Sequence, residues 1–100
     1  MTSLERFERW FIANCDGDWE HGAGIAISSL DNPGWSVDIN LRGTSLEDRS
    51  FAPVKREISE NDWHHASIDA SIFKIRCGPL NLEGAIALFC DWAEASVTSD

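Results

Sequence analysis

Hydrophobic and polar residues recur along this chain with two different periods, and the change of period divides it into elements. Near the N-terminus the apolar residues are spaced by three and four, which is typical of one face of an α-helix. They are Leu4, Phe7, Trp10 and Phe11. Thr2 and Glu5 have the spacing of a capping box, which marks the start of a helix. The pattern predicts a helix over about residues 3–14.

The middle of the chain has the period of two that is typical of β-strands. In its clearest stretch the apolar residues alternate with polar ones: Trp35, Val37, Ile39 and Leu41. A shorter apolar strand over residues 24–30 and a Pro-Gly turn at 31–34 come before it, so this region predicts a hairpin. Residues 51–58 predict a third strand, which Pro53 restricts to the edge of a sheet.

Two further strands are predicted over residues 63–70 and 72–77, although the turn between them lacks the glycine that a tight hairpin prefers. After a break at residues 78–81, an apolar stripe predicts a second helix over about residues 82–95, with Asn81 as its N-cap. We expect the last five residues to fray.

Together these elements predict an α+β fold in one domain over residues 1–100. An N-terminal helix is followed by an antiparallel meander of four to five strands and a C-terminal helix. Each helix has an apolar face, and the simplest arrangement packs both helices on one face of the sheet. We expect Leu4 of the first helix and Phe89 of the second to meet the apolar side of the strand around Ile39. The other face of the sheet would stay open.

The charge of the chain narrows the class of partner. Seventeen acidic and eight basic residues give a formal net charge of −9, which argues against binding to nucleic acid or to an anionic membrane. Such a charge suits either solubility alone or a protein that attracts a basic partner. The three cysteines, Cys15, Cys77 and Cys90, form no disulfide pattern, and no signal peptide or membrane span is visible. We therefore expect a cytoplasmic protein.

The densest group of reactive side chains is the acidic corner, residues 15–22, between the first helix and the first strand. Asp16, Asp18 and Glu20 have the spacing of a calcium loop, but His21 stands where that loop needs a glycine. Because the ligand pattern is incomplete, we expect no metal and no cofactor. A small metal-binding domain or metal-dependent hydrolase that uses these four residues is the alternative.

Catalysis by a nucleophile also fits poorly, because Cys15 lies among carboxylates that disfavour its thiolate, and we expect no enzyme. Trp19 and Trp63 are more informative. Burial in the core is the default for each of them, but an indole beside carboxylates also suits an anchor in a protein–protein contact. His64 and His65 follow Trp63, and in a strand they point to opposite faces, so only one can join a common site.

Five short stretches, taken in order after a Trp-containing first helix, carry a resemblance to a known family. They are Cys-Asp-Gly-Asp-Trp-Glu-His at 15–21, Leu-Asp-Asn-Pro-Gly-Trp at 30–35, Ser-Glu-Asn-Asp-Trp at 59–63, Gly-Pro-Leu-Asn-Leu-Glu at 78–83 and Phe-x-Asp-Trp at 89–92. In this combination the chain resembles the immunity protein 53 family of bacterial polymorphic toxin systems. His64-His65 and the glycine-free last hairpin depart from the family pattern.

The resemblance implies an immunity protein, an antitoxin that binds a cognate toxin domain and blocks it. An acidic, aromatic surface suits the blocking of a basic active site. The candidate toxin-binding residues are Asp16, Asp18, Trp19, Glu20, His21, Trp63 and His64. A structural module that oligomerises through its open sheet face is a further alternative. The sequence leaves the oligomeric state and the chemistry of the toxin open.

Overall fold

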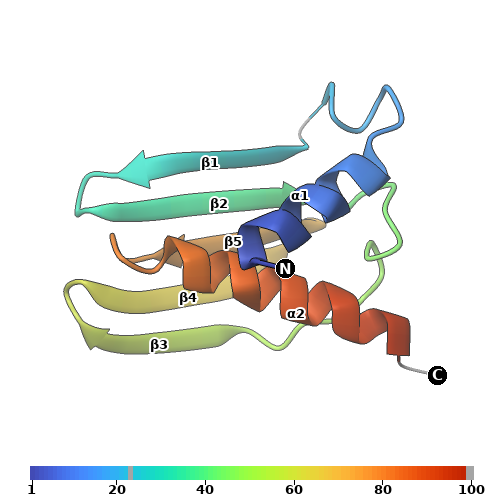
Figure 1. Ribbon diagram of the computed structural model, residues 1–100. Helices are drawn as coiled ribbons and strands as arrows, with labels where there is room; N and C mark the ends of the chain where they lie inside the picture. The colour runs from blue at the N-terminus through green and yellow to red at the C-terminus, as the bar shows by residue number, and fades with distance from the viewer. Residues whose placement is uncertain (23, 99–100) are drawn as a thin grey trace.

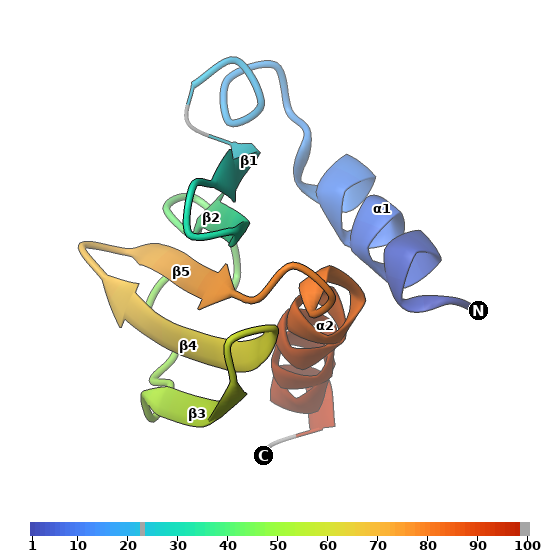
Figure 2. The same cartoon turned by 90° about the vertical axis from the view of Figure 1, so that its left-hand side faces the viewer.

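The computed structural model describes residues 1–22 and 24–98. Within them lie two helices and five strands: α1 (Ser3–Asn14), β1 (Ile25–Leu30), β2 (Gly34–Asn40), β3 (Val54–Ser59), β4 (Asp62–Asp69), β5 (Ile72–Cys77) and α2 (Leu82–Thr98). All strand pairs are antiparallel, and both helices lie on the same side of the sheet (Figures 1 and 2). The predicted α+β fold, with its two terminal helices and five strands, is confirmed.

The order of the strands in the sheet is β1-β2-β5-β4-β3, which differs from that of a simple meander. The chain leaves β2, next to the β1 edge, and crosses to the opposite edge before β3 begins. Residues 41–53 make this crossing, and they are more than a polar connection. Leu46 in the middle of the crossing is 1% exposed, and the Trp92 indole N–H of α2 donates to the Ser50 carbonyl oxygen at 3.1 Å. The crossing therefore closes one side of the core.

The core lies between α2 and the inner strands of the sheet, with β2 and β5 contributing most of its fully buried side chains. In the register of β2 and β5, Val37 lies opposite Ile75 and Ile39 lies opposite Phe73, and all four side chains are fully buried. Phe89 of α2 is also fully buried, with its ring centroid 5.2 Å from that of Phe73. The predicted docking of the second helix on the sheet is therefore confirmed, and its ring contact is with Phe73 of β5.

The first helix begins as predicted and packs on α2. The capping box forms, because the Glu5 N–H donates to Thr2 Oγ1 and the Thr2 N–H donates to Glu5 Oε1. Phe7 meets Phe89 edge to face, with 5.8 Å between the ring centroids. Leu4 does not reach the sheet as expected. It is 55% exposed, because the helix lies against α2 and places this side chain at the rim of the interface.

Arg6 of α1 links the two helices through ion pairs with two carboxylates of α2. Its guanidinium donates to Asp91 at 2.8 Å and to both carboxylate oxygens of Glu94 at 2.8 and 2.9 Å. The pKa of Glu94 is lowered by this hydrogen bond from Arg6. Helix α2 runs to Thr98, three residues beyond the predicted end. Residues 99 and 100, which we expect to fray, lie outside the described residues.

The turn between β4 and β5 has no glycine, and it adopts left-handed backbone conformations all the same. Ala70 has φ +52° and Ser71 has φ +64°, a conformation in which side chains other than glycine are strained. The Ser71 carbonyl oxygen accepts a hydrogen bond from the Leu41 N–H at 2.8 Å, which holds the turn against the end of β2.

No helix in the described part of the chain has both the length and the apolar character needed to cross a membrane.

Candidate functional site

The acidic corner is ordered by its own carboxylates. Asp16 accepts hydrogen bonds from the backbone N–H groups of Asp18 and Trp19, at 2.9 and 3.0 Å. Glu20 accepts from the N–H groups of Asp16 and Gly17, at 2.9 and 2.8 Å. The hydrogen bonds from Trp19 and Asp18 lower the pKa of Asp16, and hydrogen bonds from backbone N–H groups, its own first, lower the pKa of Glu20. Asp16 and Glu20 therefore stabilise the backbone of the loop.

Trp19 is turned into the protein. It is 8% exposed, its indole N–H donates to the Asn40 carbonyl oxygen at 2.9 Å, and its ring packs against Trp10 and Phe11. The indole thus closes the core below α1, and little of its surface is offered to a partner. The other predicted residues of the corner are all exposed; Asp16 and Glu20 accept backbone hydrogen bonds there, and Asp18 and His21 are the remaining two.

The corner also shows no arrangement suited to a metal or to a nucleophile. No group of three or more His, Cys, Asp and Glu residues within 1–22 and 24–98 is placed to hold a metal ion. Burial, followed by the charges of Glu20 and Asp16, raises the pKa of the Cys15 thiol, so the thiol is protonated at neutral pH. Nothing in the described chain therefore favours the metal-dependent hydrolase that the sequence left open.

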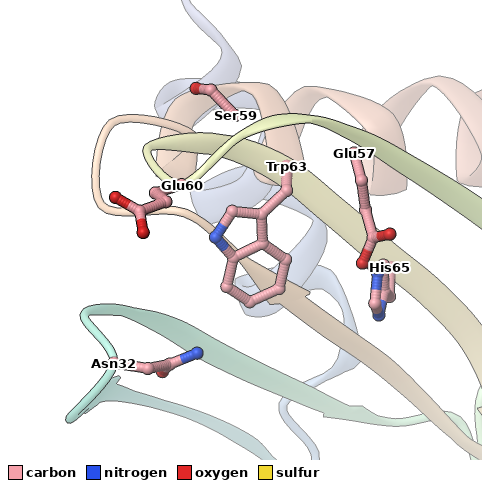
Figure 3. A pocket seen from close by; sticks show the side chains of 6 residues that line it. All are labelled: Asn32, Glu57, Ser59, Glu60, Trp63 and His65. Carbon is pink, nitrogen blue, oxygen red and sulfur yellow. Dashed lines mark hydrogen bonds and ion pairs between the residues drawn. The ribbon is translucent and has the colours of Figure 1, made fainter.

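Trp63 lies on the open face of the sheet, in a groove near the turn between β3 and β4 (Figure 3). We define the Trp63 groove by the six residues that line its volume of about 380 Å³: Asn32, Glu57, Ser59, Glu60, Trp63 and His65. Most of them come from the β3–β4 hairpin, and Asn32 comes from the turn between β1 and β2. Two hairpin turns thus meet around one half-buried indole.

The position of Trp63 is set from three directions. Its backbone N–H donates to the Asn81 side-chain oxygen at 3.2 Å, and its carbonyl oxygen accepts from the Gly78 N–H at 2.9 Å. Its ring reaches across the sheet toward β2, where a Cβ on Gly34 would lie 3.3 Å from Trp63 Cζ2 and would collide with the Cys77 carbonyl oxygen. Gly34 therefore leaves room for the strand pairing and for the indole.

Asn81 does not act as the simple N-cap that the sequence predicts. It does stand directly before α2, and its carbonyl oxygen accepts the Ala85 N–H. Its side chain, however, turns away from the helix, since the oxygen accepts from the Trp63 N–H and the amide nitrogen donates to Asp62. Asn81 thus joins the start of α2 to the start of β4.

The two adjacent histidines point to opposite faces, as strand alternation predicts. His65 shares the open face with Trp63, with 5.4 Å between the ring centroids, and its Nε2 lies 2.9 Å from Glu57 Oε2 in a hydrogen bond. His64 pairs with Cys77 in the sheet and lies on the helix-facing side, away from the groove. The sequence candidates include His64 and miss both His65 and Glu57, although a period of two from Trp63 would have selected His65.

A comparison with known families now adds to this geometry. Residues 4–94 match the family model described as immunity protein 53. The chain belongs to the immunity protein 53 family. No curated protein and no solved structure matches it. All six residues of the Trp63 groove and all of the acidic corner lie within the matched part of this immunity protein.

In this member of the immunity protein 53 family the predicted site residues form two separate regions. The acidic corner precedes β1 at one end of the sheet, whereas the Trp63 groove lies by the β1–β2 and β3–β4 turns at the other end (Figure 1). The two ends are separated by the length of β1, about 20 Å for six residues. A single small contact cannot cover both regions.

The charge on the open face of this immunity protein is mixed. The groove end carries Glu57 and Glu60, while the middle of the face carries Lys74 and Arg76. Arg76 donates to Asp38 at 2.8 Å, and Lys74 donates to Asp69 at 3.3 Å, so both of these cations are paired with carboxylates. The region that combines an aromatic ring with carboxylates is therefore the Trp63 groove.

Proposed function

We propose that this protein is an antitoxin that binds a cognate polymorphic toxin domain in a 1:1 complex in the cytoplasm and blocks its activity without catalysing a reaction. The observation that carries the proposal is the match of residues 4–94 to the immunity protein 53 family. Membership of an immunity protein family implies a protein partner, and the chemistry of the surface suggests how that partner is held.

We place the toxin contact at the Trp63 groove. Three observations support this placement. The backbone of Trp63 is held by hydrogen bonds, and its half-buried ring packs against His65, so little side-chain entropy is lost when a partner covers it. Glu57 and Glu60 stand beside it as an acidic rim. Trp19, the other candidate indole, is already buried in the core and makes its hydrogen bond there.

The partner that fits this groove carries basic side chains. A guanidinium or ammonium group over the face of Trp63 gains a cation–π interaction and meets the rim carboxylates at the same time. The net charge of −9 attracts such a partner from a distance, which speeds association at low salt. A toxin whose active site binds a negatively charged substrate has this surface, and the groove would occupy it. Asp18 and His21, at the other end of the sheet, form a secondary contact in this proposal.

The test is co-expression with the toxin domain encoded beside this gene, followed by binding kinetics in rising salt. We expect the wild-type protein to protect cells and form a 1:1 complex, and association to slow as salt rises while dissociation changes less. Glu60→Gln should slow association, whereas Glu8→Gln, an exposed carboxylate on α1, should have a smaller effect from the same loss of charge. Absence of both protection and binding would refute the proposed function. Equal effects of the two substitutions on association would show that the contact lies outside the groove.

A further inference from the structure

The two edges of the sheet are protected to very different degrees. At one edge, β3 contains Lys55, Arg56 and Glu57, follows Pro53, and has an irregular register near its end. Charged side chains, proline and bulges are the devices that keep an edge strand from pairing with another chain. At the other edge, β1 reads Ile-Ala-Ile-Ser-Ser-Leu and has neither a charged residue nor a proline.

The outer side of β1 is also uncovered. In the described residues β1 pairs with β2 alone, at the edge of the sheet (Figures 1 and 2). Residues 26–29 of this strand are exposed. Ile27 is 43% exposed, which is unusual for an isoleucine in the middle of a strand. The edge is thus an uncharged strand with an exposed isoleucine, and it is open to solvent.

The register shows which backbone groups of β1 face outward. The Asn40 N–H donates to the Gly24 carbonyl oxygen at 2.8 Å, so these two residues form a hydrogen-bonded pair. In an antiparallel ladder such pairs alternate, and Ala26 and Ser28 therefore also bond to β2. The N–H and C=O groups of the alternate residues, Ile27 and Ser29, face away from the sheet and can receive another strand.

We propose that β1 is a second contact for the toxin, where an extended, basic segment of the toxin adds as a sixth strand to the sheet. This proposal rests on the proposed function and specifies how the partner is bound. Carboxylates stand at both ends of the edge: Asp18 and Glu20 in the corner before β1, and Asp31 in the turn after it. These charges match basic residues at the two ends of an extended segment about six residues long.

The same charges disfavour a second copy of this chain as the occupant. Two copies would each bring a net charge of −9 to one contact, and their repulsion opposes the pairing. The position of the edge favours the toxin, because β1 ends at the turn that carries Asn32 into the Trp63 groove. A segment along β1 therefore leads directly to the proposed contact, and one partner covers both.

The test is amide hydrogen exchange measured residue by residue, on the free protein and on its complex with a catalytically inactive form of the toxin domain encoded beside the gene. In the free protein we expect slow exchange at Ala26 and Ser28 and fast exchange at Ile27 and Ser29. In the complex the amides of Ile27 and Ser29 should become protected. Ser29→Pro, which removes an outward N–H and no bond to β2, should weaken binding about tenfold or more, while Ser29→Thr should bind as the wild type does.

The other outcomes contradict the inference, and they show whether the β1 contact alone or the antitoxin function as well is wrong. If the complex forms, but Ile27 and Ser29 exchange as fast as in the free protein, β1 is not a contact and the antitoxin function stands. Equal affinities of the proline and threonine variants, both folded by circular dichroism, would likewise exclude β1 as a contact. If no complex forms, the proposed function and the β1 contact are both refuted. If Ile27 and Ser29 are already protected in a free protein that sediments as a dimer, a second copy occupies the edge.

Discussion

The side-chain oxygen of Asn81, directly before α2, accepts the backbone N–H of Trp63 at 3.2 Å. This hydrogen bond connects residues 18 apart in sequence and ties the start of the last helix to the start of β4. Since the amide nitrogen of Asn81 also donates to Asp62 at 3.1 Å, one side chain holds the backbone that presents Trp63. The proposed toxin contact is therefore supported by a residue that lines no part of the groove.

Asn81→Ala tests that support. The substitution leaves the partly buried Trp63 N–H without its acceptor, which should cost about 1–3 kcal/mol of the free energy of unfolding. It should also weaken toxin binding, because the indole loses its fixed position. Urea denaturation measures the first effect and calorimetric titration with the toxin domain the second. Asn61→Ala, in the exposed turn nearby, is the control and should change neither; equal losses in both variants would show that Asn81 has no special role.

Phe89 is the centre of the contact between the helices and the sheet. It is fully buried, with ring centroids of Trp10 and Phe73 at 4.9 and 5.2 Å. Phe89→Ala should therefore lower the free energy of unfolding by about 3–5 kcal/mol. Ile12→Ala, at a position that is 66% exposed on α1, should change it by less than about 0.5 kcal/mol. A loss below about 1 kcal/mol for Phe89→Ala would mean that α2 is not docked as described.

Ser71→Gly should make the protein more stable. Ser71 has φ +64° in the hairpin turn, and glycine adopts this conformation without the steric cost of a Cβ. We expect a gain of about 1 kcal/mol in the free energy of unfolding, measured by urea denaturation. Ser45→Gly, at a position without positive φ, should give no gain. If the two glycine variants shift stability alike, the turn is not strained.

The carboxylates of the acidic corner predict a loss of stability in acid. Hydrogen bonds from the Trp19 and Asp18 backbone N–H groups lower the pKa of Asp16 in the folded protein, so the unfolded chain takes up this proton at a higher pH. The contribution of Asp16 is therefore present at neutral pH and is lost as pH falls below about 4. The Glu20 carboxylate, whose pKa is also lowered, adds a loss of the same sign.

Thermal unfolding followed from neutral to acid pH checks this linkage. Asp16→Asn should be less stable than the wild type at neutral pH and should lose less stability on acidification. Asp18→Asn is the matched control, because the Asp18 side chain makes no hydrogen bond within the described residues. Parallel pH profiles for the wild type and Asp16→Asn would contradict the structural role of Asp16.

The elements of this fold could be predicted because their signals are local. The Thr2–Glu5 capping box and the spacing of apolar residues mark α1, and the alternation from Trp35 marks β2. The order of the strands could not be predicted in the same way. It depends on the crossing over residues 41–53, where Leu46 and the bond from Trp92 to Ser50 are contacts between distant parts of the chain.

The candidate site shows the same difference between local signals and contacts of distant residues. Trp63 could be chosen from the carboxylates around it in sequence, but its neighbours on the open face follow from the pairing of β3 with β4. That pairing places Glu57 opposite Trp63, which no local pattern indicates. Trp19 has equally acidic neighbours, yet it is buried, because α1 supplies Trp10 and Phe11 to cover it. Local composition alone does not distinguish the two indoles.

Calorimetric titration of the toxin domain with three variants decides whether the Trp63 groove is the toxin contact. Trp63→Ala should weaken binding by about 2 kcal/mol or more, roughly 30-fold in Kd, because it removes the anchor of the groove. Trp63→Phe should keep part of this affinity, since a ring remains beside Glu57 and Glu60. Ile12→Ala, on the exposed side of α1, should bind as the wild type does. If folded Trp63→Ala binds the toxin domain as tightly as Ile12→Ala, the toxin contact lies elsewhere.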